Sequence, residues 1–218
     1  MTCYFPIPNN IENKDSQNFN IRTSVTLINH PNNLLVRNYP SRNLLKNDIF
    51  YNLYTLYDGQ WQKFLTKKCQ FGESIEFFRD KLPLPKKNFV VIVPSKQDNL
   101  PSLTGVLPIP YSNRFDKSPI AERASYNFYI DDVSTSYQGE YPFNMAKLKR
   151  GSFFSFDSLR LDELKNSYCF IILMNLNLDA SKNNKHKIDL LHFDRSKKNI
   201  CSFDAYSNNF TVFKIPDL

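Results

Sequence analysis

Short runs of sequence in which apolar side chains occupy every second position are the feature that most limits what this chain can fold into. In the clearest run, Thr23, Val25 and Leu27 alternate with small polar residues, and a second such run spans residues 125–131. Successive side chains of a strand point to opposite faces of a sheet, so this alternation indicates strands with one buried face. Thirteen prolines and five glycines among 218 residues favour short strands joined by rigid loops.

We therefore predict a mainly β protein, an antiparallel β-sandwich with one or two short helices. The strongest local signal is Asp58-Gly59, a pair that readily takes the positive φ angles of a hairpin turn between strands at 49–57 and 60–65. The continuous apolar runs at 89–93, ended by Pro94, and at 168–174 predict central strands buried on both faces. Further strands are predicted at 74–78, 152–156, 188–193 and 210–215.

One short helix is predicted over residues 142–150. Pro142 suits the first position of a helix, Gly151 suits the left-handed residue that ends one, and basic residues near the carboxyl end complement the helix dipole. A helical turn is also expected over 159–164.

The composition changes along the chain predict a division into segments. Prolines and polar residues near the start indicate a flexible arm, and five prolines between positions 94 and 119 indicate a connection without extended pairing. The predicted segments are a flexible N-terminal arm at 1–20, a first β unit at 21–98, a Pro-rich connection at 99–120 and a second β unit at 121–218. The alternative is one merged domain over 21–218.

Similar sequence features recur in the same order in the two halves of the chain, which suggests that the β units are duplicated. Cys69 and Cys201 are each followed two residues later by an aromatic residue, and each lies ahead of an apolar strand that runs to a proline. Ordinary alternation of strands and turns produces similar recurrences, so this alternation remains the competing explanation for the apparent internal repeat.

Composition also limits the function classes. The net charge of +7 permits an anionic partner without requiring one. The basic residues form separated pairs with no helix-turn-helix pattern or basic and aromatic platform, which argues against nucleic acid. No apolar run approaches the ~20 residues of a membrane-spanning helix, so no membrane partner is expected. The start of the chain lacks the apolar core of a signal peptide, which favours a cytoplasmic location, and a mature secreted chain whose leader has been removed is the alternative.

No motif in the sequence names a reaction, a metal or a cofactor. The four cysteines are scattered, the three histidines lack the spacing of metal ligands, and the five glycines are isolated, so no phosphate-binding loop is present. We predict no catalytic residue, no metal site and no cofactor.

Candidate ligand-binding residues concentrate between positions 114 and 157, where polar and aromatic residues are expected in and around loops. Tyrosine rings there suit stacking on a sugar or a base, and charged groups of both signs suit hydrogen bonding. The competing interpretation of Asp131-Asp132 is a strand end that enters a turn. The predicted ligand-binding residues are Arg114, Arg123, Tyr129, Asp131, Tyr137, Glu140 and Tyr141.

The sequence favours a non-catalytic binding or interaction module, because it offers strands, aromatic side chains and loops without a recognisable reactive group. A small saccharide or a glycoconjugate is the expected ligand, and a protein partner is the alternative. The second hypothesis is a carbohydrate-active hydrolase or isomerase that uses Asp131, Glu140, Asp157 or His192 as acid or base. The third is an anion-binding or nucleic-acid-binding protein, which requires one continuous positive face.

Overall fold

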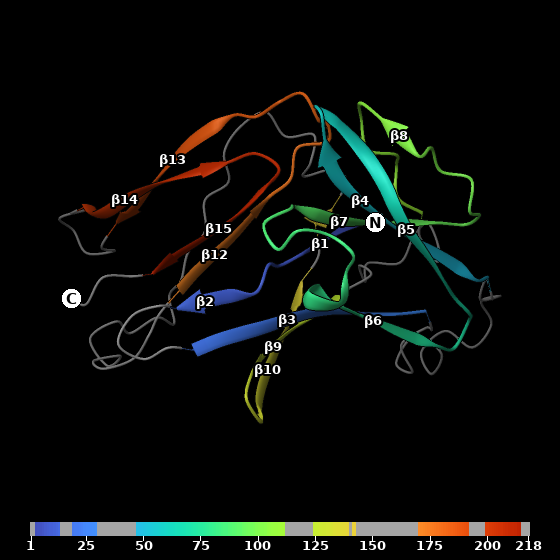
Figure 1. The fold of residues 1–218 in the computed structure, drawn as a ribbon, viewed down its shortest axis with the longest axis horizontal. Coiled ribbons are helices and arrows are strands. Elements are labelled where there is room, and N and C mark those ends of the chain that lie inside the picture. The colour runs from blue at the N-terminus through green and yellow to red at the C-terminus, as the bar shows by residue number, and fades with distance from the viewer. Residues whose placement is uncertain are drawn as a thin grey trace, which may run out of the picture.

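The computed structural model describes residues 3–13, 19–29, 47–111, 124–139, 141–142, 170–191 and 199–214. These residues form fifteen β-strands and a single 3-10 turn, η1 (Arg79–Lys81), and they contain no α-helix (Figure 1). Every strand pair is antiparallel, and the two larger sheets pack as a sandwich. The prediction of a mainly β, sandwich-like fold is confirmed.

The larger sheet has six strands in the order β11-β1-β7-β4-β5-β8. Residues distant in sequence become neighbours in it, since the N-terminal strand lies between strands from the middle of the chain. Its strands are β1 (Cys3–Ile7), β4 (Ile49–Tyr57), β5 (Gln60–Cys69), β7 (Val90–Ser95), β8 (Leu103–Thr104) and β11 (Tyr141–Pro142).

The second sheet has five strands in the order β10-β9-β3-β2, with a fifth strand, β6, also paired to β3. Its strands are β2 (Ile11–Asn13), β3 (Phe19–Ile28), β6 (Ser74–Phe78), β9 (Ala124–Ile130) and β10 (Val133–Gly139). The pairing of β3 with β9 joins the predicted first and second β units in one sheet.

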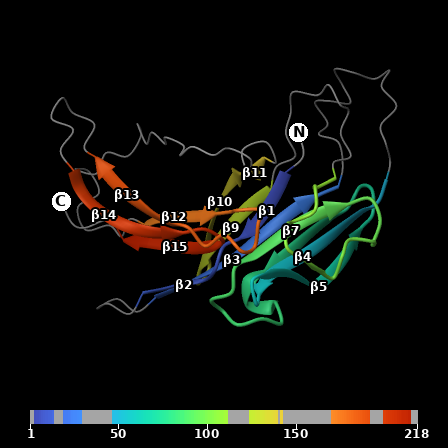
Figure 2. The same ribbon diagram turned by 90° about the horizontal axis from the view of Figure 1, so that it is seen from above.

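Two further pairs of strands lie to one side of the sandwich (Figure 2). They are β12 (Phe170–Asn175) with β15 (Asn209–Lys214), and β13 (Lys185–Leu191) with β14 (Asn199–Tyr206). The strand pairings of the two halves therefore differ: Cys69 ends β5, which pairs with β4 and β8 in the six-stranded sheet, whereas Cys201 lies in β14, which pairs with β13 in a two-stranded sheet. The described strands give the proposed duplication no support.

The β4–β5 hairpin forms as predicted, because its turn residues suit the required backbone angles. Asp58 has a φ of 46° and Gly59 a φ of 71°, the two positive values of a tight hairpin turn. The second arm continues to Cys69, beyond the predicted end at 65.

One apolar core fills the space between the two larger sheets. Phe5, Leu53 and Ile92 enter it from the six-stranded sheet, and Val25 and Tyr126 enter it from the five-stranded sheet. The inward orientation predicted for alternate residues of β3 is confirmed, since Thr23, Val25 and Leu27 are all buried. For β9 the prediction is right at Tyr126 but wrong at Ile130, which is 41 % exposed beside the turn.

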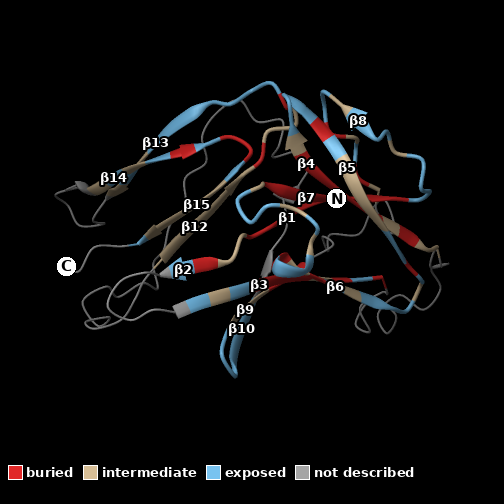
Figure 3. Cartoon of the chain, viewed as in Figure 1, coloured by how far each residue is buried: buried red, intermediate tan, exposed pale blue. Residues whose placement is uncertain are grey.

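A second core covers the opposite face of the six-stranded sheet. Tyr54, Trp61 and Val91 pack there against Leu107 and Leu176. The sheet is therefore buried on both faces, and β7, which is buried at every position, is the central strand that its continuous apolar run predicts (Figure 3).

The predicted N-terminal arm is wrong for its first residues. Cys3–Ile7 is strand β1, buried at every position and paired with β7 and β11. Its odd-numbered residues enter the first core, and Tyr4 enters the second. Because both faces of the strand are buried, its sequence does not alternate between apolar and polar residues as a half-exposed strand does. The polar residues that follow dominate the composition of this region and conceal the strand.

Other boundaries also differ from the predictions. Strand β7 runs past Pro94 to Ser95, and Pro142 lies in β11 rather than at the start of a helix. Strand β12 is half-buried in a two-stranded sheet, so the prediction of a second central strand at 168–174 is wrong for its described residues. The predicted elements at 143–150, 152–156 and 159–164 lie outside the described residues.

Candidate functional site

The outward-facing side chains of β6, β3 and β9 form a polar and aromatic surface on the five-stranded sheet. The register places Ser24 opposite Phe78 on one side and opposite Asn127 on the other. Because side chains alternate along a strand, Val25 and Leu27 enter the core and their neighbours on β3 face outward. We call this surface the polar sheet face, and it consists of Arg22, Ser24, Thr26, Glu76, Phe78, Asn127 and Tyr129.

Glu76 accepts three hydrogen bonds from neighbours on the polar sheet face, all at Oε1. The donors are the Ser24 hydroxyl, the Asn127 amide nitrogen at 3.2 Å and the Tyr129 hydroxyl at 2.8 Å. Within the part of the chain that the structure describes, no donor contacts Oε2, and the residue is exposed. The carboxylate is thus oriented through one oxygen, and the other oxygen retains its lone pairs for further donors.

Asn127 is held in turn by its own contacts. Its Nδ2 also donates to Ser24 Oγ at 3.0 Å and to Thr26 Oγ1 at 2.9 Å, and its Oδ1 accepts from the Ser125 hydroxyl at 3.0 Å. Ser24 itself is fully buried. A connected network of this kind holds its central groups in one orientation, because turning Glu76 or Asn127 breaks several hydrogen bonds.

Two aromatic rings lie beside the carboxylate. The ring centroids of Phe78 and Tyr129 are 5.8 Å apart, with the rings tilted by 32°. Two cations lie over the Phe78 ring: the Arg22 guanidinium carbon is 5.5 Å and Lys81 Nζ is 4.5 Å from its centroid, both within the range of a cation–π contact. Arg22 Nε also donates to Asp80 Oδ2 at 2.9 Å.

Tyr129 remains a hydrogen-bond donor at neutral pH. Partial burial, followed by the hydrogen bond to the Glu76 carboxylate, raises the pKa of its hydroxyl above the ordinary tyrosine value. The hydroxyl that holds the Tyr129 ring in place therefore stays protonated. The residue is half-buried, so part of its surface is accessible.

The structure describes four of the predicted ligand-binding residues and does not gather these four in one place. Tyr129 lies on the polar sheet face, whereas Tyr141 lies in β11 of the other sheet and pairs with Tyr4. Asp131 is exposed in the β9–β10 turn with a φ of 49°, as the competing interpretation of Asp131-Asp132 predicts. Tyr137 lies in β10, where its backbone pairs with Tyr126. Arg114, Arg123 and Glu140 lie outside the described residues.

Sequence reasoning missed most of the polar sheet face. Alternation in the predicted strands marks Ser24, Glu76 and Asn127 as outward-facing, and that signal was available. Their assembly depends on β6 and β9 both pairing with β3, across sequence separations of 52 and 103 residues. No local pattern encodes such pairing.

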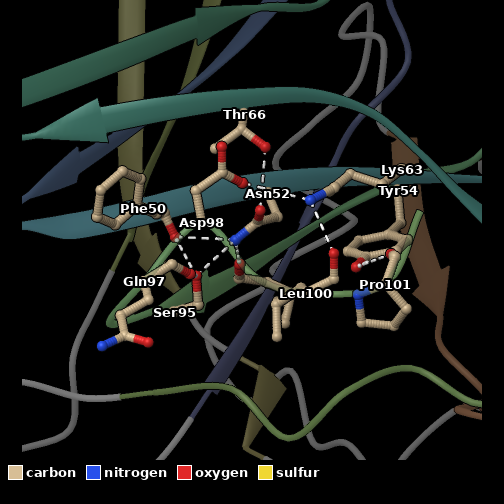
Figure 4. Close-up of polar contacts among 11 residues, drawn as sticks. Phe50, Asn52, Tyr54, Lys63, Thr66, Ser95, Gln97, Asp98, Leu100 and Pro101 are labelled. Atoms are coloured by element: carbon tan, nitrogen blue, oxygen red, sulfur yellow. Dashed lines mark hydrogen bonds and ion pairs between the residues drawn. The ribbon is translucent and has the colours of Figure 1, made fainter.

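A second polar cluster surrounds Asn52 of β4 on the other sheet (Figure 4). Asn52 is fully buried, its Nδ2 donates to Ser95 Oγ at 2.8 Å and to the Val93 carbonyl at 3.2 Å, and its Oδ1 accepts from the Thr66 hydroxyl at 3.0 Å. These groups are satisfied by the protein itself, so the cluster is structural.

Two further side chains near Asn52 hold the loop after β7 against the sheet. Lys63 Nζ donates to the Leu100 carbonyl at 2.8 Å and contacts Asp98 at 3.3 Å, while the Tyr54 hydroxyl donates to the Pro101 carbonyl at 2.8 Å (Figure 4). Burial, and to a smaller extent the charge of Asp98, raises the pKa of Tyr54 to about 12.

The described residues contain no group of three or more His, Cys, Asp or Glu side chains placed to hold a metal ion. Of the four acid–base candidates, Asp131 falls in the described ranges, and Glu140, Asp157 and His192 lie outside them. Nowhere in the described ranges is there a helix of the length and apolar character needed to cross a membrane.

Comparison with known proteins identifies no relative. No protein-family model, curated protein or solved structure matches the chain. The functional argument therefore rests on the chemistry of the polar sheet face.

Proposed function

We propose that this chain is a non-catalytic binding module that holds a saccharide or glycoconjugate on the polar sheet face. The observation that supports the proposal most strongly is the Glu76 carboxylate, held through Oε1 by three donors while no described residue donates to Oε2. A sugar ring combines hydroxyl donors with an apolar C–H face. A carboxylate oxygen beside an accessible aromatic ring complements both features.

Preorganisation supports binding at this surface. The side chains that already hold the carboxylate are Ser24, Asn127 and Tyr129. The Phe78 ring packs against the Tyr129 ring. A ligand therefore has few protein side chains to immobilise, which lowers the entropic cost of association. The paired strands that carry these residues keep them at fixed spacing.

The arrangement favours binding over hydrolysis. Glycoside hydrolysis generally uses two carboxyl groups that flank the scissile bond. Glu76 has one oxygen occupied by three donors, and the neighbouring Asp80 carboxylate is paired with Arg22. Both groups already have partners within the protein, as expected of a rigid recognition surface.

A glycan array followed by titration calorimetry on the full chain tests the proposal. Glu76→Gln keeps an acceptor at the position of Oε1 and places an NH₂ donor where Oε2 stands. Because a hydrogen bond to a charged acceptor contributes about 1.5–3 kcal/mol, the variant should bind the selected glycan at least about tenfold more weakly. The urea midpoint of each variant verifies that it folds.

Asp131→Asn is the matched control for Glu76→Gln. It removes a carboxylate from an exposed turn outside the polar sheet face, so its affinity should equal that of the wild type. A wild-type chain that binds no glycan on the array, or a Glu76→Gln variant that binds as tightly as the wild type, contradicts the proposal.

A further inference from the structure

The charged side chains on and beside the polar sheet face indicate which net charge a bound saccharide should have. We infer that the ligand is an uncharged glycan that donates two neighbouring hydroxyls to Glu76 Oε2 and lays the apolar face of one sugar ring on Tyr129. This inference rests on the proposed saccharide-binding function and specifies which saccharides the surface accepts.

The cations at this surface already have partners. Arg22 forms an ion pair with Asp80 at 2.9 Å, and both Arg22 and Lys81 lie over the Phe78 ring, at 5.5 and 4.5 Å from its centroid. A ligand carboxylate or sulfate that reached either of these exposed cations would compete with these contacts. It would then gain only the small energy of an exposed ion pair.

The charge on Glu76 further disfavours an acidic ligand. Oε2 lacks a donor among the described residues, and it belongs to an anion. Two like charges about 4 Å apart repel by about 1 kcal/mol in water and by about 4 kcal/mol near a protein surface. An anionic sugar seated against this oxygen is therefore penalised, although the chain as a whole has a net charge of +7.

A cationic sugar would be attracted by the Glu76 carboxylate but repelled by the two cations beside it. Lys81 and Arg22 lie over Phe78, whose ring centroid is 5.8 Å from that of Tyr129, so an ammonium group stacked on Tyr129 would lie near two cations. Arg22 and Lys81 together balance Glu76 and Asp80 in formal charge. A locally neutral surface with an open acceptor best complements a neutral hydroxyl donor.

The geometry of the Glu76 carboxylate limits which sugars can bind. Oε2 has two lone pairs in the carboxylate plane, and adjacent hydroxyls of a sugar ring are close enough to donate to one oxygen together. The Tyr129 ring is fixed by its hydroxyl contact to Oε1 of the same carboxylate, at 2.8 Å. The carboxylate and the ring thus form one rigid unit, which selects a sugar that presents a diol edge and an apolar face together.

Titration calorimetry with three sets of oligosaccharides tests this inference: neutral hexose oligomers, uronate or sulfated oligomers, and amino-sugar oligomers. Each set is measured at about 0.02 M and about 0.5 M salt, which screens exposed charges very differently. We expect neutral oligomers to bind best, with affinity changing less than about twofold with salt. Removal of either hydroxyl of the recognised diol should weaken binding about tenfold.

The outcomes separate the inference from the proposed function. Tightest binding of an acidic or amino-sugar oligomer, with affinity that falls steeply with salt, overturns the inference and leaves saccharide binding intact. Equal binding of the deoxy analogues also overturns it. Binding of none of the three sets refutes the proposed function itself.

Discussion

The Arg79 guanidinium donates a hydrogen bond from Nε to Asn9 Oδ1 at 2.8 Å and so joins η1 to the loop between β1 and β2. The residue is 3 % exposed, and its Nη2 also donates to the carbonyls of Pro85 and Asn88, at 2.8 and 3.0 Å. Burial lowers the pKa of this side chain, although an arginine remains cationic at any ordinary pH. One buried side chain thus connects η1 to two loops, the β1–β2 loop and the loop before β7.

We predict that Arg79→Met destabilises the protein by about 3 kcal/mol, because it removes three hydrogen bonds of a buried side chain and leaves the Asn9 amide oxygen and the Asn88 carbonyl without this donor. Urea unfolding followed by the emission of Trp61, the single tryptophan and fully buried, measures the change. Lys81→Met, an exposed change two residues away, should stay within about 0.5 kcal/mol of the wild type. Equal stability of the two variants would show that the buried hydrogen bonds contribute nothing.

We predict that Asn52→Leu costs about 2–4 kcal/mol, since it leaves the Thr66 hydroxyl without its acceptor and the oxygen of the buried Ser95 hydroxyl without its donor. Adding Thr66→Val should restore part of this loss, because it removes one of the orphaned groups. A double-mutant cycle from urea midpoints measures the coupling. Strict additivity would mean that Asn52 and Thr66 do not interact energetically.

Stability should fall at alkaline pH through two buried tyrosines. Burial raises the pKa of Tyr4 far above its ordinary value and that of Tyr54 to about 12, and their hydroxyls donate to the carbonyls of Pro108 and Pro101. Because the folded pKa is the higher one, stability is complete below about pH 10 and is then lost at about 1.4 kcal/mol per pH unit for each tyrosine.

Urea midpoints between about pH 9 and pH 11.5 measure this slope. Tyr54→Phe should reduce it, whereas Tyr57→Phe, at a ring that is 66 % exposed, is the matched control. A slope that Tyr54→Phe leaves unchanged would contradict the assignment of alkaline sensitivity to this residue.

The turn of the β4–β5 hairpin offers a test of backbone strain alone. A Cβ at Gly59 meets no atom within 4 Å, yet the φ of 71° is unfavourable for an L-residue. Gly59→Ala should therefore cost about 1–2 kcal/mol in the urea assay. At Gly105, where a Cβ also meets nothing within 4 Å and no positive φ occurs, alanine should be neutral or slightly stabilising. A result in which both variants lose the same stability would point to lost contacts rather than to φ.

Two of the local predictions agree with the structure. The Asp58-Gly59 turn forms because both residues tolerate a positive φ, and β3 buries Val25 and Leu27 because alternate positions share one face. The candidate site was less accessible to sequence reasoning. Tyr129 belongs to the polar sheet face, but its partner Glu76 is 53 residues away in sequence and was not among the predicted residues.

Strand propensity, turn chemistry and the two-residue period are local properties, so the amino-acid sequence by itself determined that this chain is mainly β and where its clearest hairpin turns. The order of strands in each sheet was decided by the tertiary structure, because pairing depends on which apolar faces bury one another over long sequence separations. That order brought Cys3–Ile7 into the six-stranded sheet beside β7. It also placed Ser24, Glu76 and Asn127 on one surface, where the polar groups of three separate strands satisfy one another.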